Sequence, residues 1–214
     1  MTKKQSRAGF TLVELSIVLV IIGLIIGGVL TGRQIMQNAQ ITNALNSIQA
    51  FQAQFQTYVQ NYGAIPGDDI NNTTRFPNAN LPGKGDGSGT LNGEFDSGTN
   101  TDETRLVWGD LRAADLVKNQ GTAADITPQP TNPFNGIYGF QHTAFTGAIA
   151  SNVLCLTNVP ADAAMAIDSR LDDGSSNTGS IQAMISTGAA GEVTGGTVAA
   201  DYGKGQTFTL CVRM

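Results

Sequence analysis

The stretch that decides the fold is RAGFTLVELSIVLVIIGLIIGGVLTGR, residues 7–33. Residues 10–30 are almost wholly apolar, which is long enough for a helix to cross a hydrocarbon core of about 30 Å. One charged residue, Glu14, interrupts this run. A carboxylate inside a membrane-spanning segment costs roughly 2.5–3.5 kcal/mol on insertion scales. This cost makes Glu14 a candidate for a pairing role.

Two general explanations of the apolar stretch compete. It can be a membrane anchor whose basic end, with Lys3, Lys4 and Arg7, stays in the cytoplasm. It can also be a secretory signal peptide, but the run is too long and no small-x-small cleavage site follows it. The pattern therefore favours an anchor that leaves the bulk of the chain outside the cytoplasm.

The residues at the start of the apolar run carry a family resemblance. After a short basic leader, Gly9 is followed by FTLVE at residues 10–14. This resembles the processing site of type IV pilins and of the pseudopilins of type II secretion. The resemblance implies that a prepilin peptidase cuts between Gly9 and Phe10, and that Phe10 becomes a methylated N-terminus.

The resemblance also gives Glu14 a role in assembly. Cleavage creates a positively charged amine at Phe10, four residues before Glu14 and on the same helix face. A buried cation and a buried anion cost far less when they are paired. The pair can form within one subunit. The resemblance implies instead a pair between Glu14 of one subunit and the Phe10 amine of its neighbour.

Charge and composition exclude other functions. The formal net charge is −5, and outside the first nine residues nine basic residues stand against 17 acidic ones. This argues against nucleic-acid binding, which needs clustered Lys and Arg. The 41% hydrophobic content is too high for a disordered chain. The 26 glycines and 14% charged residues indicate a loop-rich extracytoplasmic domain.

The helix is expected to continue beyond the membrane. Between residues 34 and 67 there is no Asp, Glu, Lys or Arg, and Gln and Asn fill the faces beside an apolar stripe. The stripe repeats at three- and four-residue steps, which indicates an amphipathic helix, and Gly63 and Pro66 end it. Its members are Ile41, Leu45, Ile48, Phe51, Phe55, Tyr58 and Tyr62.

These boundaries give three predicted parts. Residues 1–9 are the leader, residues 10–62 are one helix of about 80 Å if it is continuous, and residues 63–214 are a globular head. Within the helix, residues 10–32 are the transmembrane and assembly half. Residues 33–62 are the amphipathic half that lies under the head.

The head is expected to combine short helices with strands. Residues 64–100 are rich in turn-forming residues and predict a loop. A helix follows, with Asn100 as the expected cap and Gly121 as the expected end. A short helix runs from Pro160 to about Leu171. Four strands are expected near residues 137–141, 151–157, 180–186 and 207–213. Helices first and antiparallel strands later predict an α+β fold, as the pilin resemblance also implies.

The two cysteines are Cys155 and Cys211. An even number in a chain whose bulk lies outside the cytoplasm favours one disulfide, with two buried free thiols as the alternative. The chain contains no CxxC and no Cys/His cluster that would indicate a zinc site. The resemblance to pilins also implies a C-terminal region held by a disulfide.

No motif in the sequence indicates an enzyme. The chain has one histidine, His142, and lacks GxSxG, HExxH and P-loop motifs. The acid pairs Asp68/Asp69 and Asp172/Asp173 lie in expected turns, where aspartate commonly makes local hydrogen bonds. We therefore predict a non-catalytic protein.

Calcium is the one cofactor for which the sequence offers candidate ligands. Part of the loop at residues 83–97 places oxygen ligands at alternate positions, as at the start of an EF-hand loop. The pattern then fails, because Leu91 stands where glycine is needed and Ser97 where a bidentate glutamate is expected. We expect a solvated loop without a cofactor, and calcium is the alternative. The candidate ligands are Asp86, Ser88, Thr90, Glu94 and Asp96.

Together these features predict a type IV pilin-like subunit. It would wait in the inner membrane with its leader in the cytoplasm and its head outside. A prepilin peptidase and methyltransferase would process it, and inner-membrane assembly machinery would build it into a filament with copies of itself and other pilins. The filament would be a surface pilus for adhesion or motility, or a periplasmic pseudopilus for secretion. The alternative of another class is a single-pass anchored adhesive or binding domain that does not polymerise.

Overall fold

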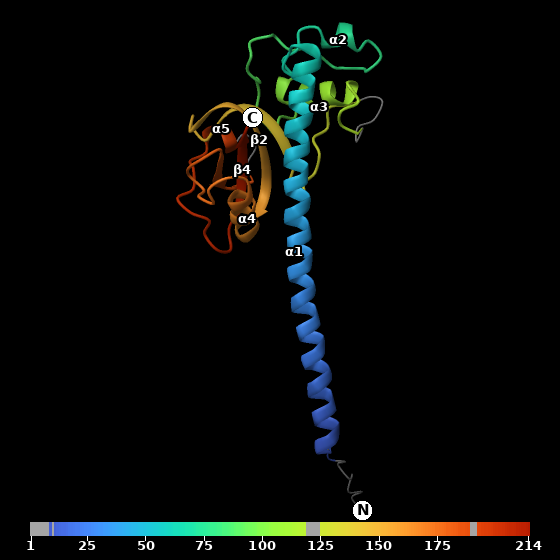
Figure 1. Ribbon diagram of the computed structural model, residues 1–214, viewed down its shortest axis with the longest axis vertical. Helices are drawn as coiled ribbons and strands as arrows, with labels where there is room; N and C mark the ends of the chain where they lie inside the picture. Colours follow the sequence, from blue (N-terminus) through green and yellow to red (C-terminus); the bar gives the residue numbers. More distant parts are fainter. Residues whose placement is uncertain (1–8, 10, 119–124, 189–191) are drawn as a thin grey trace, which may run out of the picture. The chain divides into compact units, whose positions relative to one another are not determined.

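The computed structural model describes residue 9 and residues 11–118, 125–188 and 192–214. The chain divides into two compact units, residues 1–39 and residues 40–214, and the first helix belongs to both. The elements follow in the order α1 (Leu12–Tyr62), α2 (Asn72–Arg75), α3 (Glu103–Ala113), β1 (Tyr138–Ala144), β2 (Ile149–Pro160), α4 (Ala161–Leu171), β3 (Ile181–Ile185), α5 (Glu192–Gly195) and β4 (Thr207–Arg213) (Figure 1).

The first unit consists, in its described part, mainly of the apolar half of α1. Residues 12–36 are exposed to solvent, including the leucine, isoleucine and valine side chains. Among the described residues, α1 is the one helix that is long and apolar enough to cross a membrane, judged by length and composition. The predicted long N-terminal apolar helix is confirmed.

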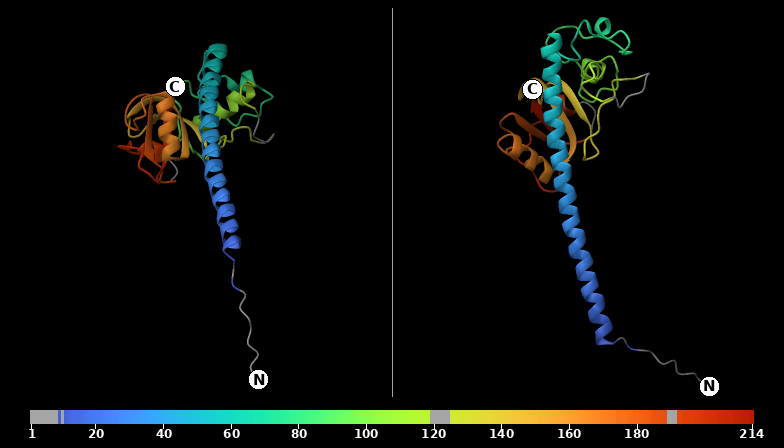
Figure 2. Two further views of the ribbon diagram at one scale, coloured as in Figure 1. Left: turned by 60° about the horizontal axis from the view of Figure 1, so that its bottom comes forward. Right: turned by 45° about the vertical axis from the view of Figure 1, so that its right-hand side comes forward.

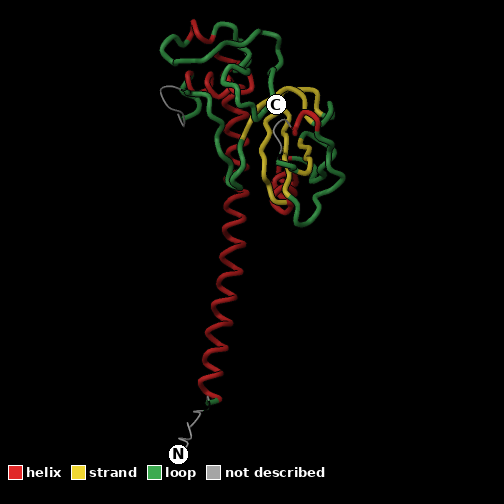
Figure 3. The backbone as a smooth tube through the Cα atoms, turned by 180° about the vertical axis from the view of Figure 1, so that it is seen from behind, coloured by secondary structure: helices red, strands yellow, loops and turns green. Residues whose placement is uncertain are grey.

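The second unit contains an antiparallel sheet, whose strands are yellow in Figure 3. Its strand order is β1-β2-β4-β3. β2 pairs with β1 on one side and β4 on the other, and β4 also pairs with β3. The last strand of the chain is therefore an inner strand of the sheet. The bounds of β4 agree with the prediction, and each of the other three strands overlaps its predicted range. The α+β fold class is confirmed.

One face of the sheet packs against helices. The C-terminal part of α1 runs beside both the sheet and α3 (Figure 2). Phe55 stacks on Phe140 of β1 at 5.5 Å between ring centroids, and Phe51 meets Trp108 of α3 edge-on at 5.0 Å. Full burial of such a side chain contributes roughly 1.5–3 kcal/mol. The predicted stripe of α1 faces this core: Ile41, Leu45, Ile48, Phe55 and Tyr58 are buried, and Phe51 and Tyr62 are partly buried.

The start of α3 differs from the prediction. Asp102, and not Asn100, occupies the N-cap position, and its side chain makes no capping hydrogen bond. The Asp102 carboxylate instead accepts a bond of 2.5 Å from the Ser97 hydroxyl. The Asn100 amide donates to Asp125 at 3.2 Å. Both side chains are thus used to hold neighbouring loops and not to cap the helix.

α3 also ends earlier than the prediction, at Ala113. Asp115 adopts a left-handed φ of 57°, and its N–H donates to the Arg112 carbonyl at 3.0 Å. The Leu116 N–H donates to the Leu111 carbonyl at 2.9 Å. These two bonds form a Schellman motif, which usually places glycine where Asp115 stands. The prediction of an end at Gly121, which lies outside the described residues, was wrong because aspartate took this role.

The loop after α1 is tied to α3 by Asp110. This fully buried carboxylate accepts the Gly67 N–H at 2.7 Å and the Asn72 amide at 2.8 Å. Gly67 has a φ of +89°, and a Cβ there would lie 2.5 Å from the Glu103 carbonyl oxygen, so glycine is required. α2 lies within this predicted loop and was not foreseen.

The stability of the head should depend on pH through Asp110. Burial raises the pKa of Asp110 to about 7, against the lowering effect of the two hydrogen bonds it accepts. Between about pH 4 and pH 7 the folded state therefore keeps a proton on Asp110 that the unfolded state has released. The stability that this protonated carboxyl contributes is full below about pH 4 and is lost as the pH rises through 7. Inside this window the free energy of unfolding should fall by at most about 1.4 kcal/mol for each tenfold drop in proton concentration.

Urea unfolding of the head at pH 5 and pH 7 measures this effect. Asp110→Asn keeps the size of the side chain but cannot titrate, so its stability should change less between the two pH values. An equal pH slope in Asp110→Asn and the wild type would contradict the assignment to Asp110.

Candidate functional site

The start of α1 brings Thr11 and Glu14 together. The Thr11 backbone N–H and hydroxyl donate to Glu14 Oε2 at 2.9 and 2.8 Å, and the Glu14 N–H donates to Thr11 Oγ1 at 3.3 Å. This is a capping box, which satisfies backbone groups that the first helical turn leaves free. The Thr-x-x-Glu spacing is the sequence signal for this role of Thr11, a role that the hydrophobic pattern alone does not reveal.

The capping box uses only one oxygen of the Glu14 carboxylate. Both bonds from Thr11 go to Oε2, and Oε1 accepts no hydrogen bond from a described residue. An ionised carboxylate has acceptor sites on both oxygens, so the cap is compatible with a second, charged partner. Gly9 is exposed, and Phe10 lies outside the described residues. Cleavage after Gly9, methylation of Phe10 and pairing of Glu14 with the new amine therefore stay predictions.

The other polar side chains in residues 12–32 are satisfied by the helix itself. Ser16 Oγ donates to the Val13 carbonyl at 2.8 Å, and Thr31 Oγ1 donates to the Gly27 carbonyl at 3.0 Å. A hydroxyl bonded in this way can enter a bilayer without an unpaired donor. Glu14 is thus the polar side chain of this segment that retains capacity for a partner outside its own chain.

Cys155 of β2 and Cys211 of β4 form a disulfide. They are direct partners in the β2–β4 ladder, and both are fully buried. They belong to a second apolar cluster, separate from the core around α1, that includes Phe95 and Val193. The bond fixes the last strand of the chain to the interior of the sheet across a sequence separation of 56.

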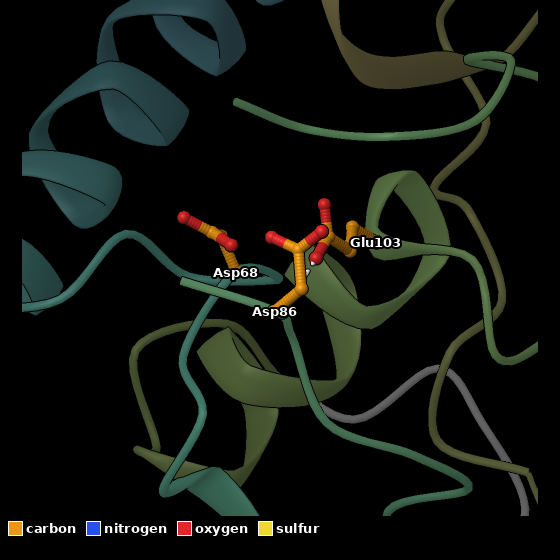
Figure 4. Close-up of side chains that lie close together, drawn as sticks. All are labelled: Asp68, Asp86 and Glu103. Carbon is orange, nitrogen blue, oxygen red and sulfur yellow. Dashed lines mark hydrogen bonds between the residues drawn. The ribbon is translucent and has the colours of Figure 1, made fainter. Parts of the chain in front are cut away.

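The acidic loop groups Asp86 with residues that the calcium prediction did not include. Oxygen atoms of Asp68, Asp86 and Glu103 lie within 4.8 Å of one another (Figure 4). The carboxylates of Glu94 and Asp96, which the sequence placed in the same candidate site, are not part of this group. Asp68 and Glu103 are nearly fully buried, whereas Asp86 is exposed. The set of ligands therefore differs from the one expected from the EF-hand-like spacing.

The two buried carboxylates shape the loop through its backbone. Asp68 accepts the N–H groups of residues 87–89 at 2.6–3.0 Å. Glu103 accepts the N–H groups of Asp86 and Asn92, both at 2.8 Å. Burial raises the pKa of Glu103, and these two bonds oppose the rise. This network gives the group a structural role that needs no metal, and calcium binding stays a prediction.

Thermal unfolding with and without a chelator tests the calcium prediction. If the group of Asp68, Asp86 and Glu103 holds calcium, EGTA should lower the Tm, because a ligand bound only to the folded state stabilises it. At calcium concentrations near 100 times Kd the effect is about 2.7 kcal/mol. Asp86→Asn removes one charge from the group and should weaken the response. Identical melting curves with and without EGTA would indicate that hydrogen bonds alone hold this loop.

A second acidic group lies at the end of α4. Asp168, Asp172 and Asp173 place oxygen atoms within 4.8 Å of one another. Asp168 is fully buried, which raises its pKa, and it accepts a bond of 2.6 Å from the Tyr202 hydroxyl. Asp173 accepts the Ser175 N–H, and Asp172 accepts the N–H groups of Ser180 and of Ile181 at the start of β3. This group also holds a loop in place.

His142 links two strands of the sheet. Its Nδ1 lies 3.0 Å from Asn152 Oδ1, and the two residues are direct partners in the β1–β2 ladder. The Asn152 amide in turn lies 3.5 Å from the Gly89 carbonyl, next to the acidic loop. This arrangement gives the histidine a structural role, as a hydrogen-bond partner between the two strands.

Comparison with known proteins identifies the N-terminal segment. Residues 4–30 match the family model described as the prokaryotic N-terminal methylation motif. No curated protein and no solved structure matches the chain. The matched segment contains Gly9, Phe10 and Glu14, and it continues into the apolar half of α1. The chain therefore carries at its N-terminus the methylation motif that is the signature of type IV pilins and pseudopilins.

Proposed function

We propose that this protein is a structural subunit of a type IV pilus or a type IV pilus-like filament. A prepilin peptidase would cleave the chain between Gly9 and Phe10 and methylate the new N-terminus. The subunit would then enter a filament by packing its N-terminal helix against those of copies of itself and other pilins. Inner-membrane assembly machinery would drive this step.

One observation carries the proposal: the methylation motif leads directly into an exposed apolar helix, and in its first turn Glu14 Oε1 accepts no hydrogen bond from a described residue. The motif is typical of pilin-type structural proteins and is not an enzyme family. Apolar side chains such as Leu19 and Leu24 are 63% and 73% exposed, so this half of α1 needs a lipid or protein environment. A bilayer suits it before assembly, and neighbouring helices suit it afterwards.

Two finer assignments follow from the same motif. As a pilus subunit, the protein would reach the cell surface, with its head available for adhesion. As a pseudopilin of type II secretion, it would stay in a periplasmic fibre. Electron microscopy of fibres sheared from the cell surface separates the two, because a periplasmic fibre is not released by shear. A subunit that remains in the inner membrane and never polymerises would instead be an anchored binding domain.

Replacement of Gly9 by valine should block processing. The small Gly9 lets the peptidase approach the bond before Phe10, and a β-branched side chain next to that bond obstructs it. A Cβ at Gly9 meets no atom within 4 Å, so the change should leave the fold intact. Full-length precursor should accumulate on an immunoblot.

Gly23→Val is the matched control, because it makes the same change in the apolar segment that follows the cleavage site, and a Cβ there also meets no atom within 4 Å. This variant should be processed normally. Sequencing of the mature N-terminus should begin at Phe10 in the wild type and in Gly23→Val. Normal processing of Gly9→Val, or another mature N-terminus, would contradict the proposed cleavage site.

A further inference from the structure

Two overlapping Asn-x-Thr sequences precede and enter α2. They are Asn71-Asn72-Thr73 and Asn72-Thr73-Thr74, and the sequence contains no other Asn-x-Ser or Asn-x-Thr. This pattern is the acceptor sequence for N-linked glycosylation of chains that leave the cytoplasm. The pattern alone does not decide which asparagine could serve, since both satisfy it.

The structure distinguishes the two asparagines. Asn72 is fully buried, and its amide donates to Asp110 at 2.8 Å and to the Gly83 carbonyl at 3.2 Å. Its Oδ1 accepts the Thr73 N–H at 2.6 Å. A sugar on this amide would break these bonds and could not fit in the core. Asn72 is therefore a structural residue and not an acceptor.

Asn71 has the opposite environment. It is exposed, and its side chain makes no hydrogen bond to a described residue. It occupies the N-cap position of α2, where asparagine usually bonds to the helix backbone, yet no such bond is made. Thr73 and Thr74 are also exposed, so the hydroxyl two residues after Asn71 is accessible. The acceptor amide and the threonine that a transferase must recognise both face solvent.

We propose that Asn71 is a site of N-linked glycosylation. The donor would be an oligosaccharide on a polyprenyl diphosphate, presented on the outer side of the inner membrane. Asn71 Nδ2 would bond to the anomeric carbon of the sugar and give up one proton to a base of the transferase. The bond from that carbon to the diphosphate oxygen would break, and polyprenyl diphosphate would leave. The inference rests on the proposed function only in placing the head outside the cytoplasm.

Mass spectrometry of mature protein purified from its own cells tests this assignment. Trypsin should release residues 34–75 as one peptide, because no Lys or Arg lies between residue 33 and Arg75. This peptide should carry the mass of an oligosaccharide, with fragment ions that place it on Asn71. An unmodified peptide in the wild type would overturn the proposal.

Two threonine variants form a matched pair. Thr73→Ala destroys the acceptor sequence of Asn71, and Thr74→Ala destroys only that of Asn72. The added mass should disappear in Thr73→Ala, persist in Thr74→Ala and return in Thr73→Ser. Loss in Thr74→Ala with retention in Thr73→Ala would assign the sugar to Asn72 and contradict the inference. Both side chains are exposed, so neither variant should unfold the head.

The same digest separates this inference from the proposed function. Trypsin should also release the mature N-terminal peptide, residues 10–33 with a methylated Phe10. Its presence beside an unmodified peptide 34–75 would reject glycosylation and leave the filament proposal standing. The absence of this methylated peptide beside a glycosylated peptide 34–75 would reject the filament proposal and leave the glycosylation inference standing.

Discussion

Filament yield should fall by at least about tenfold when Glu14 is replaced by alanine, since a loss of only about 1.4 kcal/mol per contact changes an equilibrium constant tenfold. A buried amine at Phe10 would lose its counter-charge, and an unpaired charge in an apolar layer costs several times RT. Membrane insertion and leader cleavage should persist, and removal of the carboxylate should make insertion more favourable. Sheared fibres and membrane fractions, quantified by immunoblot, measure the two effects separately.

Glu14→Gln is the sharper test because it separates charge from capping. Glutamine at this position can still accept the Thr11 bonds of the capping box, but it carries no charge. It should therefore lose filaments as alanine does, while Glu14→Asp should give an intermediate yield because the carboxylate is kept with a shorter reach. Wild-type filament yield from Glu14→Gln would show that the carboxylate acts only within its own helix.

Loss of the Cys155–Cys211 disulfide should destabilise the head strongly. The bond closes a loop across a sequence separation of 56, which corresponds in the chain-entropy model to about 4 kcal/mol. The double variant Cys155→Ala/Cys211→Ala keeps apolar side chains at two fully buried positions and therefore mainly removes the cross-link. Urea unfolding of the variant and the wild type under oxidising conditions gives the difference.

Reduction of the wild type is the control for the alanine variant. The wild type in reducing buffer should unfold at nearly the urea concentration of the double variant, and the variant should not respond to reductant. If the wild type in oxidising buffer matched the double variant, the disulfide would contribute nothing. Two free thiols in mature protein, found by non-reducing mass spectrometry, would show that the bond does not form.

The sequence predicted the parts of this fold that depend on local patterns. The stripe from Ile41 to Tyr62 repeats with the period of a helix over many turns, and four of the seven residues at 207–213 are Thr, Phe or Val, which favour strands. A glycine or proline in the sequence marks a helix end only where the helix in fact stops at that residue, and α3 stopped before Gly121. Asp115 ends α3 in a left-handed conformation that aspartate adopts less often than glycine. A search for glycine and proline therefore could not reveal this helix end.

The carboxylate group and the hydrogen-bond partners of the head were less predictable, because they join residues that are distant in the sequence. Asp86 meets Asp68 and Glu103 only after α3 has packed beside the loop, and a search for alternate ligands within one loop could not find them. The environment of Asn72 likewise depends on Asp110, 38 residues further on. Thr11 is the exception, since a Thr-x-x-Glu spacing at the start of an apolar helix signals its contact with Glu14.

The place of β4 in the sheet bears on how the subunit is made. The apolar half of α1 leaves the ribosome before the sheet does, and β4 is the last of the four described strands to follow. Because β4 lies between β2 and β3, those two strands have no partner on that side until residues 207–213 arrive. Pairings so distant in sequence also form slowly. A nascent chain that stopped before β4 would have an open sheet. For the proposed pilin-like subunit, this open sheet would be a substrate for proteases before assembly into a fibre.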